Sequence, residues 1–121
     1  MVWYEGCWEL ETEDVSFEVR LKRERAEVQG SFLLVRLCSV ANELTACRIR
    51  EGTLQGTFGA NRTVDLRLIV SEYDDEGRVR LTPGPDGRML HWEEIDYPEL
   101  GLADPTSRFL PQSFDLAPCS G

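Results

Sequence analysis

The residues of this chain that could act as an acid, base or nucleophile are few and scattered. His91 is the only histidine, and it stands between Leu90 and Trp92. If Leu90 and Trp92 face the core from a strand, His91 faces solvent; in the opposite register, His91 and Met89 line the interior. No Gly-x-Ser-x-Gly, His-Glu-x-x-His, P-loop or Gly-x-Gly-x-x-Gly motif is present. The sequence therefore predicts no catalytic residues and leaves His91 as a candidate for ligand binding.

Carboxylates gather at Glu93-Glu94 and at Asp74-Asp75-Glu76. The second group lies in a turn-like stretch before Gly77, and it lacks the alternating ligand spacing of a calcium loop. Glu93 and Glu94 are expected to pair with arginines of a neighbouring strand, such as Arg78 or Arg80. No metal and no cofactor is predicted.

The four cysteines allow three pairings, which their spacing does not distinguish. Cys38 and Cys47 flank a polar stretch and would face each other across a hairpin. Cys7 and Cys119 lie near opposite ends of the sequence and become neighbours if the strands close into a barrel. There is no Cys-x-x-Cys, so zinc is not expected. The favoured expectation is four reduced, partly buried thiols, followed by a Cys38–Cys47 disulfide.

The composition indicates one globular domain spanning residues 1–121, with 41% hydrophobic and 29% charged residues. The net charge of −9 would repel phosphate backbones and anionic lipids, so neither nucleic acid nor a membrane surface is an expected partner. A basic protein partner fits better, although solubility alone can account for the charge. Residues 1–14 carry no secretory signal, and no apolar run approaches the roughly 20 residues of a membrane span. A cytoplasmic location is therefore expected.

Apolar residues alternate with polar ones through most of the chain, which predicts half-buried antiparallel strands. Strands are expected over residues 15–21 and 28–40, with a bend or bulge at Gly30. Two further strands are predicted on either side of a turn at Glu51-Gly52. Turn signals at 74–77 and 83–87, a long loop over 96–107 and a closing strand at 109–118 complete the pattern. The fold class is thus all-β: an antiparallel up-and-down β-barrel of about eight strands is favoured over a sandwich.

The stretch YEGCWEL places Gly6-x-Trp8 on the first strand of this meander and resembles the calycins, the superfamily of lipocalins and avidin-type barrels. The resemblance implies that Gly6 permits a close backbone approach and that Trp8 plugs the closed end. It also implies that a basic side chain, here Arg108, lies across the Trp8 ring. The spacing in GSF…GTLQGTF is similar to that of avidin-type barrels, but the polar biotin ligands of avidins have no counterpart. The resemblance therefore implies an architecture and no particular ligand.

Aromatic residues on several strands either fill such a barrel or wall a pocket, and filling is the default. Trp3 is expected at a rim or outside. Arginines recurring on strands would pair with acids if outward, whereas two inward ones would hold a carboxylate. The candidate ligand-binding residues are Trp8, Phe17, Phe32, Phe58, His91, Trp92 and Arg108.

The leading hypothesis is a barrel that binds a small, largely apolar molecule, with or without an acidic group. The alternative is an inhibitor or immunity-type module that presents acidic loops near Asp74 and Asp96–Glu99 to a basic protein. A barrel enzyme of the cyclase or isomerase type is the third hypothesis, because such catalysts need few reactive groups.

Overall fold

The computed structural model describes residues 3–71, 75–84, 87–96 and 113–119, apart from the side chains of Val40, Cys47 and Asp75. It contains eight strands and one 3₁₀ turn. The elements are β1 (Gly6–Glu11), β2 (Val15–Glu24), β3 (Glu27–Val40), β4 (Glu43–Phe58), η1 (Ala60–Arg62), β5 (Val64–Val70), β6 (Asp75–Pro83), β7 (Leu90–Asp96) and β8 (Ser113–Pro118).

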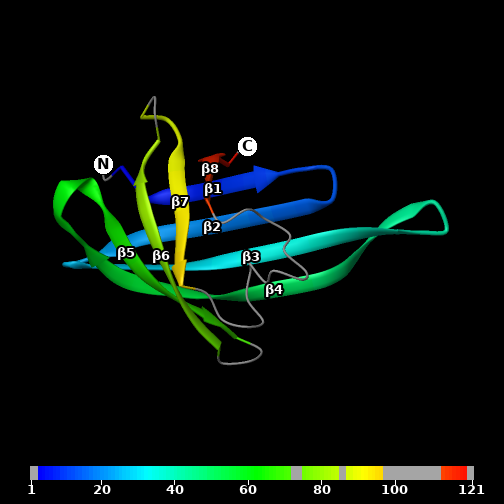
Figure 1. Ribbon diagram of the computed structural model, residues 1–121, viewed down its shortest axis with the longest axis horizontal. Coiled ribbons are helices and arrows are strands. Elements are labelled where there is room, and N and C mark those ends of the chain that lie inside the picture. Colours follow the sequence, from blue (N-terminus) through cyan, green and yellow to red (C-terminus); the bar gives the residue numbers. More distant parts are fainter. Residues whose placement is uncertain (1–2, 72–74, 85–86, 97–112, 120–121) are drawn as a thin grey trace.

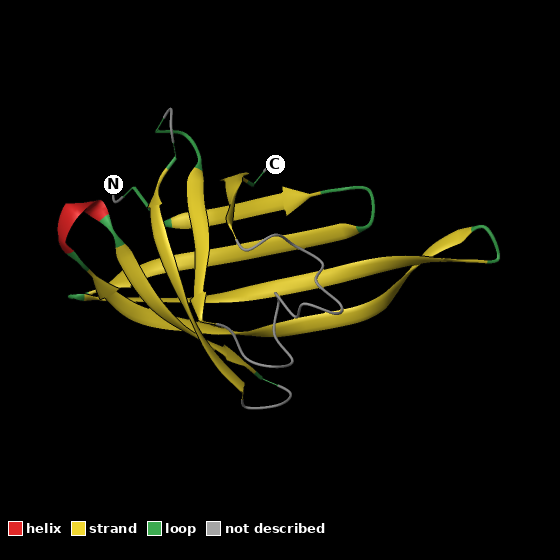
Figure 2. Ribbon diagram, viewed as in Figure 1, coloured by secondary structure: helices red, strands yellow, loops and turns green. Residues whose placement is uncertain are grey.

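The strands pair in chain order, each antiparallel to the next, and β8 pairs with β1 to close the barrel. In Figure 1, β2, β3 and β4 run across the view while β6 and β7 cross them steeply, as the twist of a small barrel requires. Figure 2 shows that strands account for almost all of the described chain. The predicted all-β, up-and-down barrel is confirmed. Among the described residues, no helix has the length and apolar character needed to cross a membrane.

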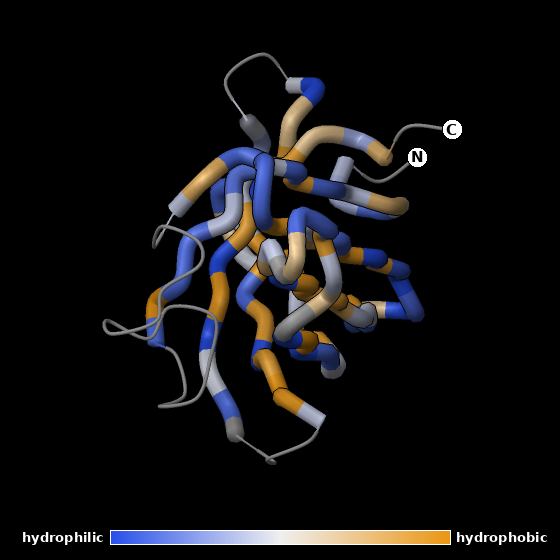
Figure 3. The backbone as a smooth tube through the Cα atoms, turned by 90° about the vertical axis from the view of Figure 1, so that its right-hand side faces the viewer, coloured by the Kyte–Doolittle hydropathy of each residue, from blue (hydrophilic) through white to orange (hydrophobic). Residues whose placement is uncertain are grey.

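The alternation of apolar and polar residues in the sequence places the apolar side chains inside the barrel and most of the polar ones outside. On β2, Val15, Phe17, Val19 and Leu21 are all buried, and the residues between them reach the outer face. β5 repeats this arrangement from Val64 to Val70. The tube in Figure 3 accordingly changes between hydrophobic and hydrophilic colours along the strands. Removing these apolar side chains from water is the main source of the barrel's stability.

Two sequence-based expectations about glycines are wrong. Glu51-Gly52 is not a turn, because β4 continues through it. A Cβ at Gly52 would overlap the carbonyl oxygen of Ile69, so glycine here permits the close approach of β5. Gly30 is likewise in regular register with Leu21 and Leu54. The register of the β3–β4 pair shifts instead between Arg36 and Leu37, which pair with Arg48 and Ala46, so the extra residue belongs to β4.

The β3–β4 hairpin extends well beyond the barrel (Figure 1). Its pairing runs from Glu27↔Thr57 to Val40↔Glu43, whereas β2 pairs with β3 only as far as Arg36 and β5 pairs with β4 only from Gly52 onward. We call the part formed by residues 37–40 and 43–49 the projecting ribbon. Its turn residues Ala41 and Asn42 have φ of 53° and 66°, the left-handed values of a type I′ turn.

The β1–β8 seam is much shorter. Within the described residues its register comprises Trp8↔Pro118 and Glu9↔Ala117. The Cys119 amide then donates to the Cys7 carbonyl oxygen at 3.0 Å. A disulfide joins Cys7 to Cys119, whose Cα atoms are 5.4 Å apart.

The favoured expectation of reduced cysteines is therefore wrong for Cys7 and Cys119. Cys38 is disulfide-bonded as well. The Cys47 side chain, and with it the predicted Cys38–Cys47 pairing, lies outside the described residues.

Candidate functional site

Four of the predicted lining residues lie inside the barrel: Trp8, Phe17, Phe32 and Trp92 are between 0 and 8% exposed. Phe17 is at the centre of an aromatic cluster, with ring centroids 5.1 Å from Trp92, 5.9 Å from Phe114 and 6.5 Å from Phe32. The cluster spans β2, β3, β7 and β8. These rings therefore pack against one another; Phe17, Phe32 and Trp92 are buried inside the barrel, and Phe114 is partly exposed at its edge.

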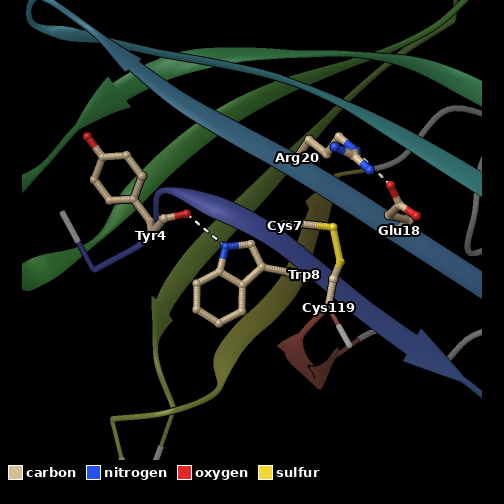
Figure 4. The surroundings of a disulfide bond; sticks show 6 residues. All are labelled: Tyr4, Cys7, Trp8, Glu18, Arg20 and Cys119. Atoms are coloured by element: carbon tan, nitrogen blue, oxygen red, sulfur yellow. Dashed lines mark hydrogen bonds and ion pairs between the residues drawn. A yellow bond between two sulfur atoms is a disulfide. The ribbon is translucent and has the colours of Figure 1, made fainter. Parts of the chain in front are cut away.

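Trp8 occupies the interior near the start of β1, and its indole Nε1 donates to the Tyr4 carbonyl oxygen at 2.8 Å (Figure 4). Gly6 does not serve a close approach, because a Cβ there would have no atom within 4 Å. Its φ of 127° is the reason for glycine, since L side chains rarely adopt it. Arg108, which was expected across Trp8, lies outside the described residues.

His91 faces outward, which settles the two registers left open by the sequence. Its Nδ1 lies 2.8 Å from Asp115 Oδ1, and the two residues are register partners on β7 and β8. Both side chains are more than a third exposed. His91 therefore belongs to the outer surface and does not line the interior.

Glu94 differs from the sequence-based expectation. It shares the inner face of β7 with Leu90 and Trp92 and is 1% exposed, so it is a buried carboxyl within the barrel. Glu93 alone takes the expected outer position, in register with Arg80. The alternation from Trp92 to Glu94 was the signal for this inward orientation, but the acidic side chain was assumed to face water.

The strand arginines fall into two groups. Arg67, Arg78 and Arg80 are exposed on the outer face, where Arg67 pairs with Glu76 at 2.7 Å and Arg80 with Asp65 at 2.9 Å. The hydrogen bond with Asp65 raises the pKa of the Arg80 guanidinium above its ordinary value, so this charge is permanent.

The second group lies on β3 and β4 where these strands approach the projecting ribbon. Because side chains alternate between the two faces of a strand, the inner face that contains Phe32 and Leu34 continues into this group. It comprises Arg36, Arg48 and Arg50, which make interactions of their own.

A pocket with aromatic walls lies at the end of the barrel that carries η1 and the β2–β3 turn, the end on the left of Figure 2. This end pocket has a volume of about 340 Å³ and is lined by Trp3, Tyr4, Arg23, Ala26 and Phe58. Trp3 and Tyr4 meet edge to face with centroids 5.3 Å apart, and Phe58 lies 6.0 Å from Tyr4. Phe58 is 50% exposed, so an aromatic face is open to a ligand.

A second arginine stands beside the end pocket. The Arg62 guanidinium carbon lies 5.9 Å from the centroid of the Trp3 ring, within cation–π range. Asn61 and Arg62 both adopt left-handed backbone conformations, with φ of 59° and 56°. Such a conformation is unusual for arginine and strains the turn, and strain of this kind concentrates at functional sites.

Of the predicted lining residues, only Phe58 contributes to the end pocket. Tyr4, Arg23, Ala26 and Arg62 were missed, and Trp3 was expected at a rim without a defined role. Gly59-Ala60-Asn61 has the composition of a turn, but nothing in the sequence indicates that this turn carries a guanidinium to the N-terminal aromatic residues.

Comparison with protein-family models, with curated proteins and with solved structures gives no match to this chain.

Proposed function

We propose that this protein is a calycin-like barrel that binds a small, flat, apolar molecule with an anionic group, and that the end pocket is its binding site. Support for the calycin-like class comes from Gly6-x-Trp8 on the first strand of a closed meander. The class of ligand is the one that the leading sequence-based hypothesis gives. The proposed binding site differs from the expected one, because packed aromatic rings fill the interior of the barrel where the ligand was expected.

The observation that carries the proposal is the meeting of exposed aromatic surface with two arginines. Phe58 offers an exposed ring for stacking, and Arg23 lines the same pocket. Arg62 lies against the Trp3 ring beside the pocket and adds a second cation there. A planar guanidinium binds a carboxylate through paired N–H donors, so an acidic ligand is favoured over a neutral one.

The interior is less suited to the same ligand. Phe17, Trp92 and Leu34 are no more than 1% exposed, and binding there would require the aromatic cluster to open.

The disulfides favour an oxidising compartment over the cytoplasmic location expected from the sequence, since such bonds are rare where thiols are kept reduced. The other two hypotheses stay predictions. The acidic loops that the inhibitor-type hypothesis requires fall mainly outside the described residues. The hypothesis of a cyclase or isomerase specifies no reacting group.

Binding of 1-naphthoate, compared with the neutral analogue 1-naphthalenemethanol, tests the proposal by isothermal titration. We expect 1-naphthoate to bind more tightly by about tenfold or more, which corresponds to roughly 1.4 kcal/mol. Arg62→Met should remove most of that preference, and Phe58→Ala should weaken both probes. Arg78→Met is the matched control, because Arg78 is an exposed arginine that lines a different pocket, one that shares no residue with the end pocket.

Equal affinity for the two probes would overturn the anionic class of ligand. Binding that survives Arg62→Met and Phe58→Ala but is lost in Trp92→Leu would place the ligand inside the barrel. If neither probe binds and a basic protein does, with an affinity that falls as salt rises, the inhibitor-type hypothesis replaces this one.

A further inference from the structure

The disulfide at the β1–β8 seam has a carboxylate beside it. One ligand atom each from Cys7, Cys119 and Glu18 lies within 4.8 Å of the other two. Figure 4 shows the three side chains together, carried by β1, by the residue that follows β8 and by β2. All three residues are half-buried. Among the described residues this is the one cluster with a metal-ligand arrangement.

Two cysteine sulfurs and a carboxylate oxygen form a donor set suited to zinc, which takes thiolate and carboxylate ligands in tetrahedral sites. Three protein ligands leave the fourth position to water. The sulfurs cannot ligate strongly while they are bonded to each other, because the thiolate is the ligand form. The site is thus closed to metal in the oxidised protein and becomes available on reduction.

We propose that reduction of the Cys7–Cys119 disulfide converts this seam into a binding site for a thiophilic divalent cation such as Zn²⁺, with Glu18 as the third ligand. A dithiol reductant breaks the S–S bond and is itself oxidised to a disulfide, while Cys7 and Cys119 become thiols. Metal binding then forms two metal–sulfur bonds and releases the two thiol protons.

The backbone keeps the two cysteines together after the S–S bond is broken. The Cys119 amide donates to the Cys7 carbonyl oxygen at 3.0 Å, and the pairs Trp8↔Pro118 and Glu9↔Ala117 lie immediately beyond. The Cα separation of 5.4 Å leaves room for the sulfurs to move apart around an ion. The metal would then take over the role of the covalent bond in closing the shortest pairing of the barrel.

Glu18 is held at present by Arg20, whose Nε lies 2.7 Å from Glu18 Oε1. The two side chains are 38% and 68% exposed, so solvent screens this ion pair and it contributes little. Rotation of the carboxylate toward the sulfurs therefore meets weak resistance. The same argument predicts that Arg20→Gln does not weaken the metal site.

Titration of the reduced protein with Co²⁺ tests the proposal, because cobalt substitutes for zinc and its thiolate complexes absorb in the near ultraviolet. The chain carrying Cys38→Ser and Cys47→Ser is used beside the natural sequence, so that Cys7 and Cys119 are its only cysteines. We expect one Co²⁺ per chain with a thiolate charge-transfer band, and displacement of that band by Zn²⁺. The oxidised protein should show no such band.

Glu18→Gln should weaken Co²⁺ binding by tenfold or more, and Cys7→Ser should abolish the band. Glu11→Gln is the matched control, since it removes an exposed carboxylate from the same strand as Cys7. A reduced natural-sequence chain without a thiolate band, or an unchanged band in Cys7→Ser, would overturn the proposal. Unchanged affinity in Glu18→Gln would overturn it too. Circular dichroism of each variant confirms that the barrel has formed.

Discussion

Two strand pairings of this barrel differ in how they are maintained. The β3–β4 hairpin pairs along its whole length and extends past the barrel into solvent, whereas the β1–β8 seam consists of a few residues near Trp8 and Pro118. The hairpin is closed by a local turn at Ala41-Asn42, so few intervening residues must be ordered to form it. The seam joins residues from opposite ends of the sequence, and its disulfide spans a separation of 112 residues.

The two pairings differ in what supports them. The long hairpin joins sequence neighbours, is held by its backbone hydrogen bonds and a disulfide at Cys38, and extends outward without a core beneath it. The short seam is reinforced twice, by a covalent bond on its outer side and by the aromatic cluster of Phe17, Trp92 and Phe114 on its inner side.

The largest expected effect concerns the inner reinforcement. Phe17→Ala removes the ring that contacts aromatic residues on three other strands, and we expect it to lower the free energy of unfolding by about 3–5 kcal/mol. Urea denaturation followed by tryptophan fluorescence measures the change. Phe58→Ala is the matched control: Phe58 is 50% exposed, and its removal should cost clearly less. Equal losses in the two variants would mean that Phe17 has no special role at the seam.

The outer reinforcement comes next. Replacing both Cys7 and Cys119 with serine should lower the free energy of unfolding by about 2–5 kcal/mol, chiefly because the unfolded chain regains the freedom that the cross-link removes. Cys38→Ser instead breaks the disulfide of a cysteine that lies in the projecting ribbon, and it should cost less because this part of β3 is outside the barrel. A larger loss for Cys38→Ser than for the seam pair would reverse the comparison.

The smallest expected effect is at the tip of the hairpin. Ala41 has a left-handed φ of 53°, which asparagine tolerates better than alanine. Ala41→Asn should therefore stabilise the ribbon against local opening by about 0.5–1 kcal/mol, measured by amide hydrogen exchange of residues 37–46. In contrast, Leu44→Ser at a 63% exposed position should leave the stability within about 0.5 kcal/mol. Faster exchange in Ala41→Asn would contradict the turn assignment.

Much of the fold was predictable from the sequence because local patterns determine it. The alternation in Val15–Leu21 and Val64–Val70 predicted the inner faces, and the polar stretch between Cys38 and Cys47 predicted a hairpin there. The break at Gly52 was predicted wrongly because a glycine that ends a strand and one that admits a neighbouring backbone look identical in sequence. The distinction depends on Ile69, which belongs to the next strand.

The candidate site was less predictable than the fold. Phe58 was selected as an aromatic strand residue, but its partners Trp3 and Arg62 come from the N-terminal segment and from a strained turn. Their proximity depends on closure of the whole barrel, which no local pattern encodes. Glu94 illustrates the same limit: its inward position follows from strand alternation, yet its charge suggested the outer surface.

The Cys7–Cys119 bond also has a mechanical consequence. The sequence between these two residues contains nearly the whole barrel, and the bond turns it into a closed covalent loop. Tension applied to the chain on either side of this loop is transmitted through the two sulfur atoms and bypasses the strands between them. An oxidised molecule pulled in this way would lengthen hardly at all before a covalent bond breaks, whereas the reduced molecule could unravel strand by strand from the seam.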